Sequence, residues 1–308
     1  MKTITGAQSE LIQAVLAERD VGELTAGILE KDIHVTDALE ALFTAELPGV
    51  RLIFCGGTSL SKGYDLIKRM SEDVDLKIEL APYAGQSKTK DSARFKEIAS
   101  TIAALLSGLG FDEVPEQRKV VDGYRQVETG WRFERQFEWS HAIRPELKVE
   151  FKAGTPSLPT ARLPLGYLVD ALAGTPRPRF EAECLAYAET LSDKVVAFTR
   201  RYAQSQQGPA AWDDTLLRHV HDVHCILSQH PDAASAAAAV FEPLLQAESQ
   251  RYRGQFPAFA DDPKQTLRAS LAAIEQDQHL KTQYNQKLIS LLYGRDKPAY
   301  EQALASFQ

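Results

Sequence analysis

Two aspartates, Asp73 and Asp75, are the residues of this 308-residue sequence whose spacing most directly suggests chemistry. Apolar residues alternate with polar ones over residues 74–80, which predicts a half-buried strand. Residues two apart on a strand face the same way, with Cα atoms about 6.6 Å apart. Two such carboxylates can share a divalent cation. We expect Mg²⁺, or Mn²⁺ in its place, because hard cations prefer oxygen ligands.

A third carboxylate, Glu150, lies on the polar face of a second predicted strand over 147–151. It could bind the metal that activates an attacking hydroxyl, or it could act as the base for that hydroxyl. The alternative is that Asp73 and Asp75 only solvate one face of an edge strand, since short motifs recur by chance.

A glycine-rich segment precedes the aspartates and begins directly after the apolar run Leu52-Ile53-Phe54, which we expect to be a buried strand. A helical stretch follows the glycines and extends to about Lys68. Glycine lets the backbone approach a ligand closely, and free N–H groups at a helix start favour phosphate. A tight turn is the alternative for the glycine pair. We expect nucleotide contacts from Gly56, Gly57, Thr58 and Ser59.

Lys62 lies one turn into the same predicted helix. It could reach a phosphate, or it could be a charge in solvent. Both interpretations stay open at the level of sequence.

The composition excludes some classes of protein. The net charge is −7 and the isoelectric point is near 5.6, which argues against a strongly basic nucleic-acid binder. A local basic groove remains compatible with these values, although residues 116–180 hold only eleven basic residues against eight acidic ones. Three cysteines without a C-x-x-C pair are typical of reduced thiols. No apolar stretch suggests a signal peptide or membrane span, so we expect a cytoplasmic protein.

The remaining pattern predicts the domain organisation. A hairpin is expected over 119–139, with its turn near Thr129-Gly130, and a loop rich in proline and glycine over 153–180. Helix, strand, helix, strand, helix and further strands come first, and helices alone come last. This order predicts an α+β protein, with a mixed-sheet domain over 1–160 and a mostly helical domain over 161–308. Helices are expected over 8–20, 24–45, 91–107, 185–204, 212–229 and 265–305, with an alanine-rich helix former at 233–239.

The stretch FCGGTSLSKGYDLIKRMSEDVDLKI, residues 54–78, resembles the signature of the AbiEii/MenT family of nucleotidyltransferase toxins from type IV-like toxin–antitoxin systems. Residues 29–43 are similar to the helical lead-in of that family. SDKVVAFTRR at 192–201 and LRHVHDVHCIL at 217–227 resemble its later helices. The resemblance implies a DNA polymerase β-type nucleotidyltransferase domain followed by a helical domain.

The resemblance also implies roles for individual residues. Asp73 and Asp75 would hold the metal, and the segment from Gly57 to Ser59 would hold nucleotide phosphate. Lys194 and Asp222 would line the nucleotide and transfer site from the helical domain. The chain departs from the R-D-x-x-D pattern of the family at His219, which replaces the first aspartate.

The function implied by the resemblance is transfer of a nucleoside monophosphate from a nucleoside triphosphate to an RNA 3′ end. The family points to tRNA as the target, to inhibited translation and growth as the outcome, and to a cognate antitoxin as a partner. An enzyme of the same fold could instead nucleotidylate a protein such as its antitoxin. A nucleotide-binding toxin without catalysis is a third class, and the intact carboxylates argue against it.

Overall fold

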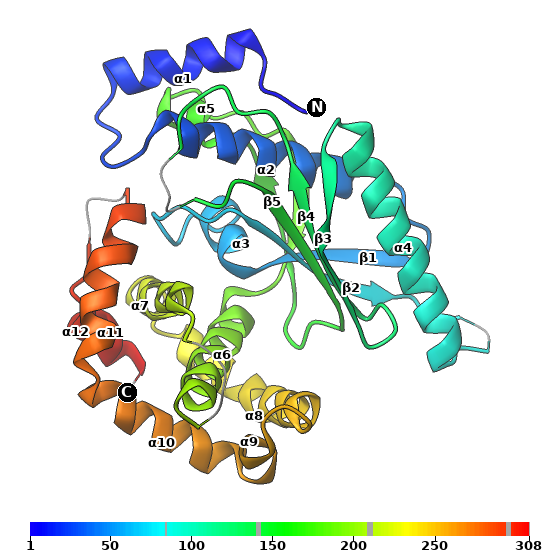
Figure 1. Cartoon of the computed structure of the whole chain (residues 1–308), viewed down its shortest axis with the longest axis vertical. Coiled ribbons are helices and arrows are strands. Elements are labelled where there is room, and N and C mark those ends of the chain that lie inside the picture. Colours follow the sequence, from blue (N-terminus) through cyan, green and yellow to red (C-terminus); the bar gives the residue numbers. More distant parts are fainter. Residues whose placement is uncertain (84, 140–142, 208–211, 294–296, 308) are drawn as a thin grey trace. The chain divides into compact units, whose positions relative to one another are not determined.

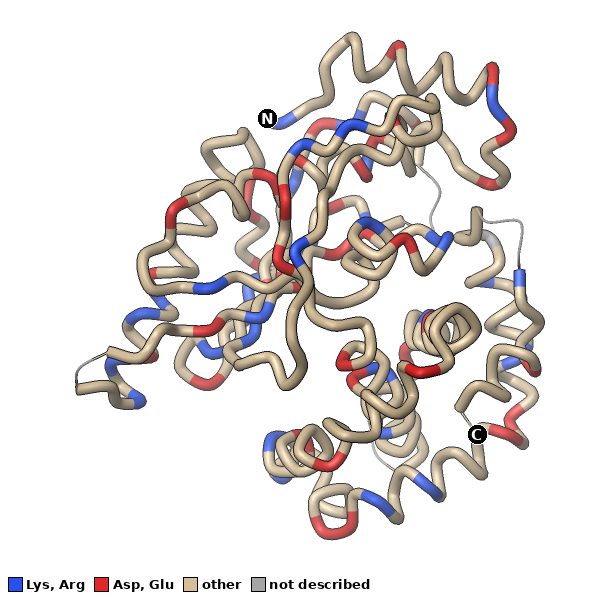
Figure 2. The backbone as a smooth tube through the Cα atoms, turned by 180° about the vertical axis from the view of Figure 1, so that it is seen from behind, with Lys and Arg blue, Asp and Glu red and all other residues tan. Residues whose placement is uncertain are grey.

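The computed structural model describes residues 1–83, 85–139, 143–207, 212–293 and 297–307. Its contacts divide the chain into two compact units, which are coloured by sequence in Figure 1. The first, here the sheet unit, contains Met1–Asp65 and Arg69–Leu185. The second, here the helical unit, contains Leu66–Lys68 and Ala186–Gln308. Acidic and basic positions are interspersed along the traced backbone of both units (Figure 2).

The sheet unit is built on a seven-stranded mixed sheet with the order β3-β4-β5-β2-β1-β7-β6 among the described residues. The central strand β2 runs antiparallel to β1 and parallel to β5. The mixed sheet predicted from the sequence is therefore confirmed. The strands are β1 Val50–Cys55, β2 Asp73–Leu80, β3 Asp112–Val121, β4 Gln126–Arg132, β5 Leu147–Ala153, β6 Ala161–Leu165 and β7 Phe180–Cys184.

Two helices, α2 and α4, bury the apolar face of the sheet. Leu39 of α2 and Ile102 of α4 belong to one hydrophobic cluster with Val74, Leu76 and Ile78 of β2. Because side chains alternate along a strand, the aspartates of β2 lie on the opposite face. The helices of the sheet unit are α1 Gly6–Glu18, α2 Ala26–Thr44, α3 Gly56–Lys62, α4 Lys88–Gly108 and α5 Leu168–Leu172.

The predicted turn near Thr129-Gly130 is wrong. The hairpin turns instead at residues 122–125, where Asp122, Gly123 and Tyr124 all have positive φ, at 47°, 57° and 67°. Gly130 lies inside β4, and a Cβ there would come within 1.9 Å of the Gln117 Oε1 atom. The glycine thus makes room for a side chain of the neighbouring strand, which a sequence pattern cannot distinguish from a turn.

The predicted loop over 153–180 and the boundary after residue 160 also differ from the structure. Strand β6, helix α5 and strand β7 lie in or beside this segment, and all belong to the sheet unit. β7 joins the sheet in parallel with β1, where Cys184 pairs with Phe54. Pro164 is tolerated in β6 because β6 is an edge strand. The unit therefore ends at Leu185.

The helical unit is organised around α6, which contacts α7, α8 and α10. The predicted helices over 185–204 and 212–229 are confirmed as α6 and α7, and the alanine-rich stretch begins α8. The predicted helix over 265–305 is interrupted at Asp277, whose Oδ1 accepts the His279 N–H at 2.9 Å and starts a new helix. None of the described helices has the length and apolar character to cross a bilayer. The main helices are α6 Tyr187–Gln207, α7 Leu217–Gln229, α8 Ala233–Tyr252, α9 Pro257–Asp261, α10 Pro263–Gln276, α11 Gln278–Gln283 and α12 Tyr300–Leu304.

Candidate active site

The parallel pairing of β2 with β5 brings the predicted carboxylates together. Asp75 is in register with Glu150, and Asp73 is in register with Lys148. Directly paired residues share a face of the sheet, so the three carboxylates project from neighbouring strands toward the same side. The alternation of polar and apolar residues predicted each carboxylate on the polar face of its strand. The pairing of β2 with β5 brings them close together.

Asp75 lies against the first residue of α3. A Cβ on Gly56 would come within 2.2 Å of the Asp75 Oδ2 atom, and Gly56 has a φ of +74°. Only glycine meets both conditions without strain. Burial raises the pKa of Asp75 to about 7, and the negative charges of Asp73 and Glu150 add to the effect. A bound cation would relieve this repulsion.

One carboxylate oxygen of Asp73 is left without a hydrogen bond from the described residues. Its Oδ1 atom is buried and has no hydrogen-bond partner among the described residues. The Arg144 Nη1 atom lies 3.5 Å away, too far for a normal hydrogen bond. Buried carboxylate oxygens are ordinarily satisfied, so an exception suggests an ion. Asp73 and Asp75 together therefore fit a hard divalent cation.

The Glu150 carboxylate forms ion pairs with two lysines in this structure. It contacts Lys152 at 2.9 Å and Lys148 at 3.3 Å, and it accepts a hydrogen bond from Gln126 at 3.0 Å. Burial alone would raise the pKa of Glu150, but Lys152 and Lys148 outweigh it and hold the pKa at about 2. No three His, Cys, Asp or Glu side chains of the described chain are arranged as a metal-binding group. The predicted role of Glu150 in metal binding stays a prediction, and it would require the loss of a lysine contact.

The hydroxyl groups predicted to contact phosphate bind the protein itself. Thr58 donates to the backbone oxygen of Asp73 at 2.6 Å and lies 2.9 Å from the Ser71 hydroxyl. The Ser59 hydroxyl donates to the Gly56 oxygen at 3.2 Å. Both side chains are fully buried. Their hydrogen bonds fasten α3 to the start of β2, and phosphate binding at α3 stays a prediction.

The space beside Gly57 is also filled. A Cβ on Gly57 would meet the Arg69 Nη2 atom at 2.7 Å and the Ser71 hydroxyl at 2.9 Å. Arg69 is buried. Lys62 forms an ion pair with Asp32 at 2.5 Å, and both side chains are largely buried. Lys62 is therefore not the solvated charge that sequence allowed, and its contact with phosphate stays a prediction.

Lys194 and Asp222 form a buried ion pair between α6 and α7. The Lys194 Nζ atom lies 2.7 Å from Asp222 Oδ2, and the two side chains are 8% and 0% exposed. On the other side, Asp222 Oδ1 lies 3.4 Å from the Nδ1 atom of His221, which is also buried. A pair this well shielded costs more to form than an exposed salt bridge, which makes its presence informative.

The family model for the nucleotidyl transferase AbiEii toxin of type IV toxin–antitoxin systems matches residues 37–306. The match includes the carboxylates of β2 and β5 as well as the buried ion pair. This chain belongs to the AbiEii nucleotidyltransferase toxin family. The resemblance seen in the sequence is thereby confirmed.

A solved structure of MenT4, a nucleotidyltransferase toxin from Mycobacterium tuberculosis, is similar to the chain at 19% sequence identity and a TM-score of 0.40. That similarity covers 73% of this chain and 72% of the MenT4 chain. No curated protein matches the sequence.

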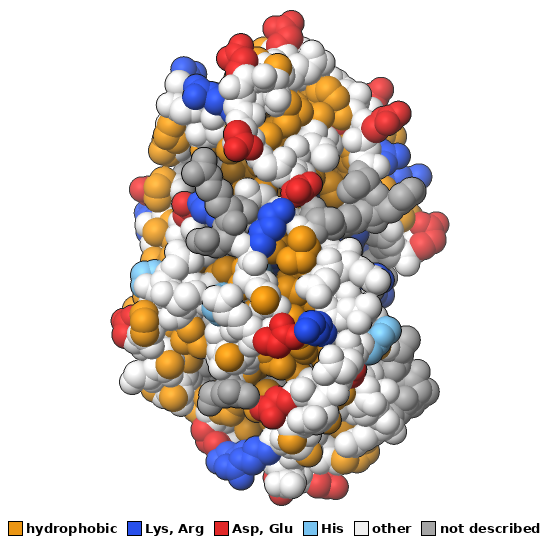
Figure 3. Space-filling model, turned by 90° about the vertical axis from the view of Figure 1, so that its left-hand side faces the viewer, with side chains coloured by type: hydrophobic (Ala, Val, Ile, Leu, Met, Phe, Trp, Pro, Cys, Tyr) orange, Lys and Arg blue, Asp and Glu red, His pale blue; other side chains and the backbone are white. Residues whose placement is uncertain are grey.

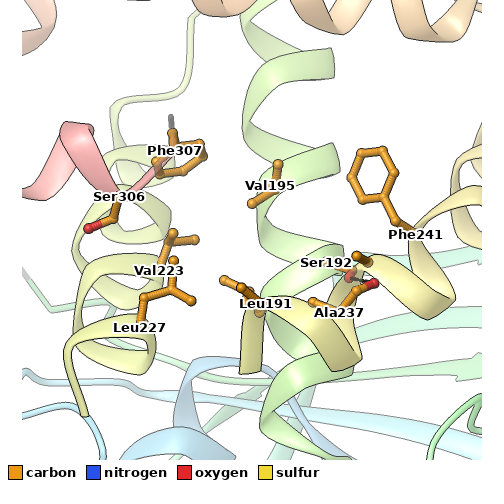
Figure 4. A pocket seen from close by; sticks show the side chains of 11 residues that line it. Leu191, Ser192, Val195, Val223, Leu227, Ala237, Phe241, Ser306 and Phe307 are labelled. Atoms are coloured by element: carbon orange, nitrogen blue, oxygen red, sulfur yellow. Dashed lines mark hydrogen bonds between the residues drawn. The ribbon is translucent and has the colours of Figure 1, made fainter. Parts of the chain in front are cut away.

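This AbiEii family member also has an apolar pocket inside its helical unit, of about 290 Å³ (Figure 4). Leu191 and Val195 of α6 face Val223 of α7 and Phe241 of α8 across it, and Phe307 borders it from the chain end. Ser192 adds a hydroxyl that already donates to the Ala237 oxygen at 2.9 Å. Neither residue of the buried ion pair is among the residues that line this pocket.

On the face drawn in Figure 3, acidic and basic side chains lie singly or in pairs of opposite sign among apolar and polar surface. A nucleic-acid contact on such a surface would depend on a few positioned cations rather than on an extended basic field.

Proposed function

We propose that this member of the AbiEii family transfers a nucleoside monophosphate from a nucleoside triphosphate to the 3′ end of an RNA, with tRNA as the expected target. The proposal includes Mg²⁺ dependence, a cytoplasmic site of action, and inhibition of translation and growth that a cognate antitoxin relieves. The observation that carries it is the buried Oδ1 atom of Asp73 beside Asp75, which has no hydrogen-bond partner among the described residues, in a chain of a nucleotidyltransferase family.

In the proposed reaction the 3′ hydroxyl oxygen forms a bond to the α-phosphorus of the nucleotide. The bond from that phosphorus to the bridging oxygen breaks, and pyrophosphate leaves with the electron pair. Asp73 and Asp75 would hold Mg²⁺, and a metal there would supply neutralisation of phosphate charge and activation of the attacking hydroxyl. Glu150 is the candidate to accept the hydroxyl proton or to complete the metal site. The N–H groups at the start of α3 would orient the triphosphate.

Lys194 is proposed as a cation for the phosphates, with Asp222 as the residue that orients it. The contact of 2.7 Å between them supports this division of roles, because a buried carboxylate fixes the ammonium in one direction. Positioned cations of this kind stabilise the charge that develops in phosphoryl transfer.

The test is to incubate the protein with each of the four α-³²P-labelled ribonucleoside triphosphates, Mg²⁺ and total RNA. We expect label in small RNA with one nucleotide, and none after periodate has destroyed the RNA 3′ diols. Asp73→Asn and Asp75→Asn should each abolish the transfer while the protein stays folded. Label on the protein or on an added antitoxin would favour protein nucleotidylation. No label with any nucleotide would contradict catalysis.

A further inference from the structure

Arg144 lies beside the Asp73 oxygen that has no hydrogen-bond partner among the described residues. Its Nη1 atom is 3.5 Å from Asp73 Oδ1, and its side chain is 44% exposed. That distance gives electrostatic attraction without a normal hydrogen bond. The carboxylate is therefore compensated in charge while its oxygen stays unsatisfied.

The backbone of Arg144, in contrast, is firmly held. Its N–H donates to Glu72 Oε2 at 2.9 Å, and its carbonyl oxygen accepts from the Lys31 ammonium at 3.0 Å. Lys31 also donates to the Glu146 oxygen at 2.6 Å, and it faces Glu72 at 3.7 Å. Lys31 and Glu72 are both buried. Burying an ion pair costs free energy. Because the buried pair of Lys31 and Glu72 holds the backbone of Arg144, it suggests that the position of this exposed arginine matters.

The charges around the site explain why accurate placement matters. The three carboxylates of β2 and β5 lie beside the cations Lys148, Lys152 and Arg144, and Lys148 also contacts Glu128 at 3.2 Å. Lys148 and Lys152 both contact Glu150 at 3.3 Å or less. A divalent cation on Asp73 would place further positive charge beside Arg144, whose Nη1 atom lies 3.5 Å from Asp73 Oδ1. A guanidinium so close to a metal is repelled unless it finds another anion.

We propose that Arg144 exchanges partners during the catalytic cycle. It compensates Asp73 in the metal-free protein, and it contacts the triphosphate of the nucleotide once a divalent cation occupies Asp73. The planar guanidinium matches phosphate oxygens in two-point contacts, and the exposed side chain on a fixed backbone can turn between the two anions. Arg144 is thereby a nucleotide-binding residue of the proposed active site, and this inference rests on the proposed function.

The test compares wild-type protein with Arg144→Gln in two binding measurements that need no catalysis. The first is Mn²⁺ binding without nucleotide, followed by the electron paramagnetic resonance of free Mn²⁺. The variant should bind Mn²⁺ about fivefold more tightly, because a competing cation beside Asp73 is gone. The second is calorimetric binding, with Mg²⁺, of the α,β-methylene analogues of the four ribonucleoside triphosphates, which cannot transfer the monophosphate. The variant should bind the preferred analogue at least about tenfold more weakly.

Arg125→Gln is the matched control, because Arg125 is similarly exposed at 42% and forms its ion pairs with Asp91 and Asp122. It removes the same charge from the sheet unit and should leave both constants unchanged. Opposite shifts in Arg144→Gln support the exchange. Parallel weakening of both ligands would reduce Arg144 to a structural role and overturn it, and so would an unchanged affinity for the analogue. Wild-type protein that binds neither Mn²⁺ nor any analogue would refute the proposed function itself, and the inference with it.

Discussion

The buried Lys194–Asp222 pair allows activity and stability to be separated by substitution. Lys194→Met removes the ammonium and leaves the Asp222 carboxylate, which is 0% exposed, without the partner at 2.7 Å. Breaking a buried pair in this way costs about 3–5 kcal/mol. For a unit of this size the loss corresponds to a fall of roughly 10–20 °C in the melting temperature of the helical unit. Loss of transfer in this variant alone would therefore not identify a catalytic lysine.

The double variant Lys194→Met with Asp222→Leu resolves the ambiguity. It removes both charges and fills their volume with apolar side chains, a replacement that is often neutral or stabilising. We expect the melting temperature to return to within a few degrees of wild type, roughly the scatter of such replacements. Nucleotide transfer should stay lost, because the cation that the phosphates need is still missing.

The assay combines circular dichroism melts with transfer of label from the preferred nucleotide, measured at 20 °C on folded protein. Arg201→Met is the control on α6, because Arg201 pairs with Asp213 at 2.9 Å in an exposed bridge, with side chains 43% and 36% exposed. It should change stability by less than about 1 kcal/mol. Full transfer by the double variant would refute a catalytic role for Lys194. An unchanged melting temperature in Lys194→Met would refute the energetic argument from burial.

Three further predictions concern the sheet unit. The pKa of Asp75 is about 7 in the folded protein and 3.8 in its ordinary, unfolded state. Metal-free protein therefore loses stability as the pH rises between these two values. At pH 8 with EDTA, Asp75→Asn should melt at a higher temperature than wild type. Gly56→Ala should lower the melting temperature and abolish transfer, because its Cβ would lie 2.2 Å from Asp75 Oδ2, whereas Gly108→Ala, with nothing within 4 Å, should not. Burial lowers the pKa of His34 from 6.5 to about 3, so the stability of the folded protein falls as the pH drops below 6.5. In His34→Phe the melting temperature should therefore depend less on pH between pH 7 and 5 than in wild type. An equally steep pH dependence in the variant would contradict this.

The site on β2 and β5 could be predicted from sequence because it depends on local periodicity. Alternation alone placed Asp73, Asp75 and Glu150 on polar strand faces. Their contact required only that the two strands be neighbours, which the parallel pairing supplies. The hairpin turn and the end of the sheet unit could not be predicted in this way. They depend on backbone angles at Asp122 and on the pairing of β7 with β1.

Helix α2 shows the limit of pattern reading more clearly. Glu30, Lys31, Asp32 and His34 have the types of a solvated helix face, yet all four are buried. Their partners come from distant segments: Glu30 accepts the N–H of Gln136 at 2.7 Å, and Lys31 reaches backbone oxygens at positions 144 and 146. A sequence shows periodicity, but it does not show which polar group will satisfy another across more than a hundred residues.

The glycines at the start of α3 show a similar limit of interpretation from sequence. They were expected to let a nucleotide approach the backbone, and the structure shows protein groups in that space instead: Asp75 at Gly56 and Arg69 at Gly57. Glycine indicates that something must come close, without saying what. A ligand that approaches the start of α3 would meet backbone N–H groups that lie beside the Asp75 carboxylate and the Arg69 guanidinium.

Asp75 and Glu150 are paired in register, but their pKa values are shifted in opposite directions. This difference indicates different roles for the two carboxylates. Lys148 and Lys152 flank Glu150 on its own strand and hold its pKa at about 2, whereas burial and its acidic neighbours raise that of Asp75 to about 7. A group with a pKa near 2 is a weak proton acceptor at neutral pH. As long as both lysines stay in place, Glu150 is better suited to supply fixed negative charge than to act as a base. Of the two roles that the sequence left open for Glu150, the lysine contacts therefore argue against proton abstraction, and metal binding stays a prediction that needs one of these contacts to be released.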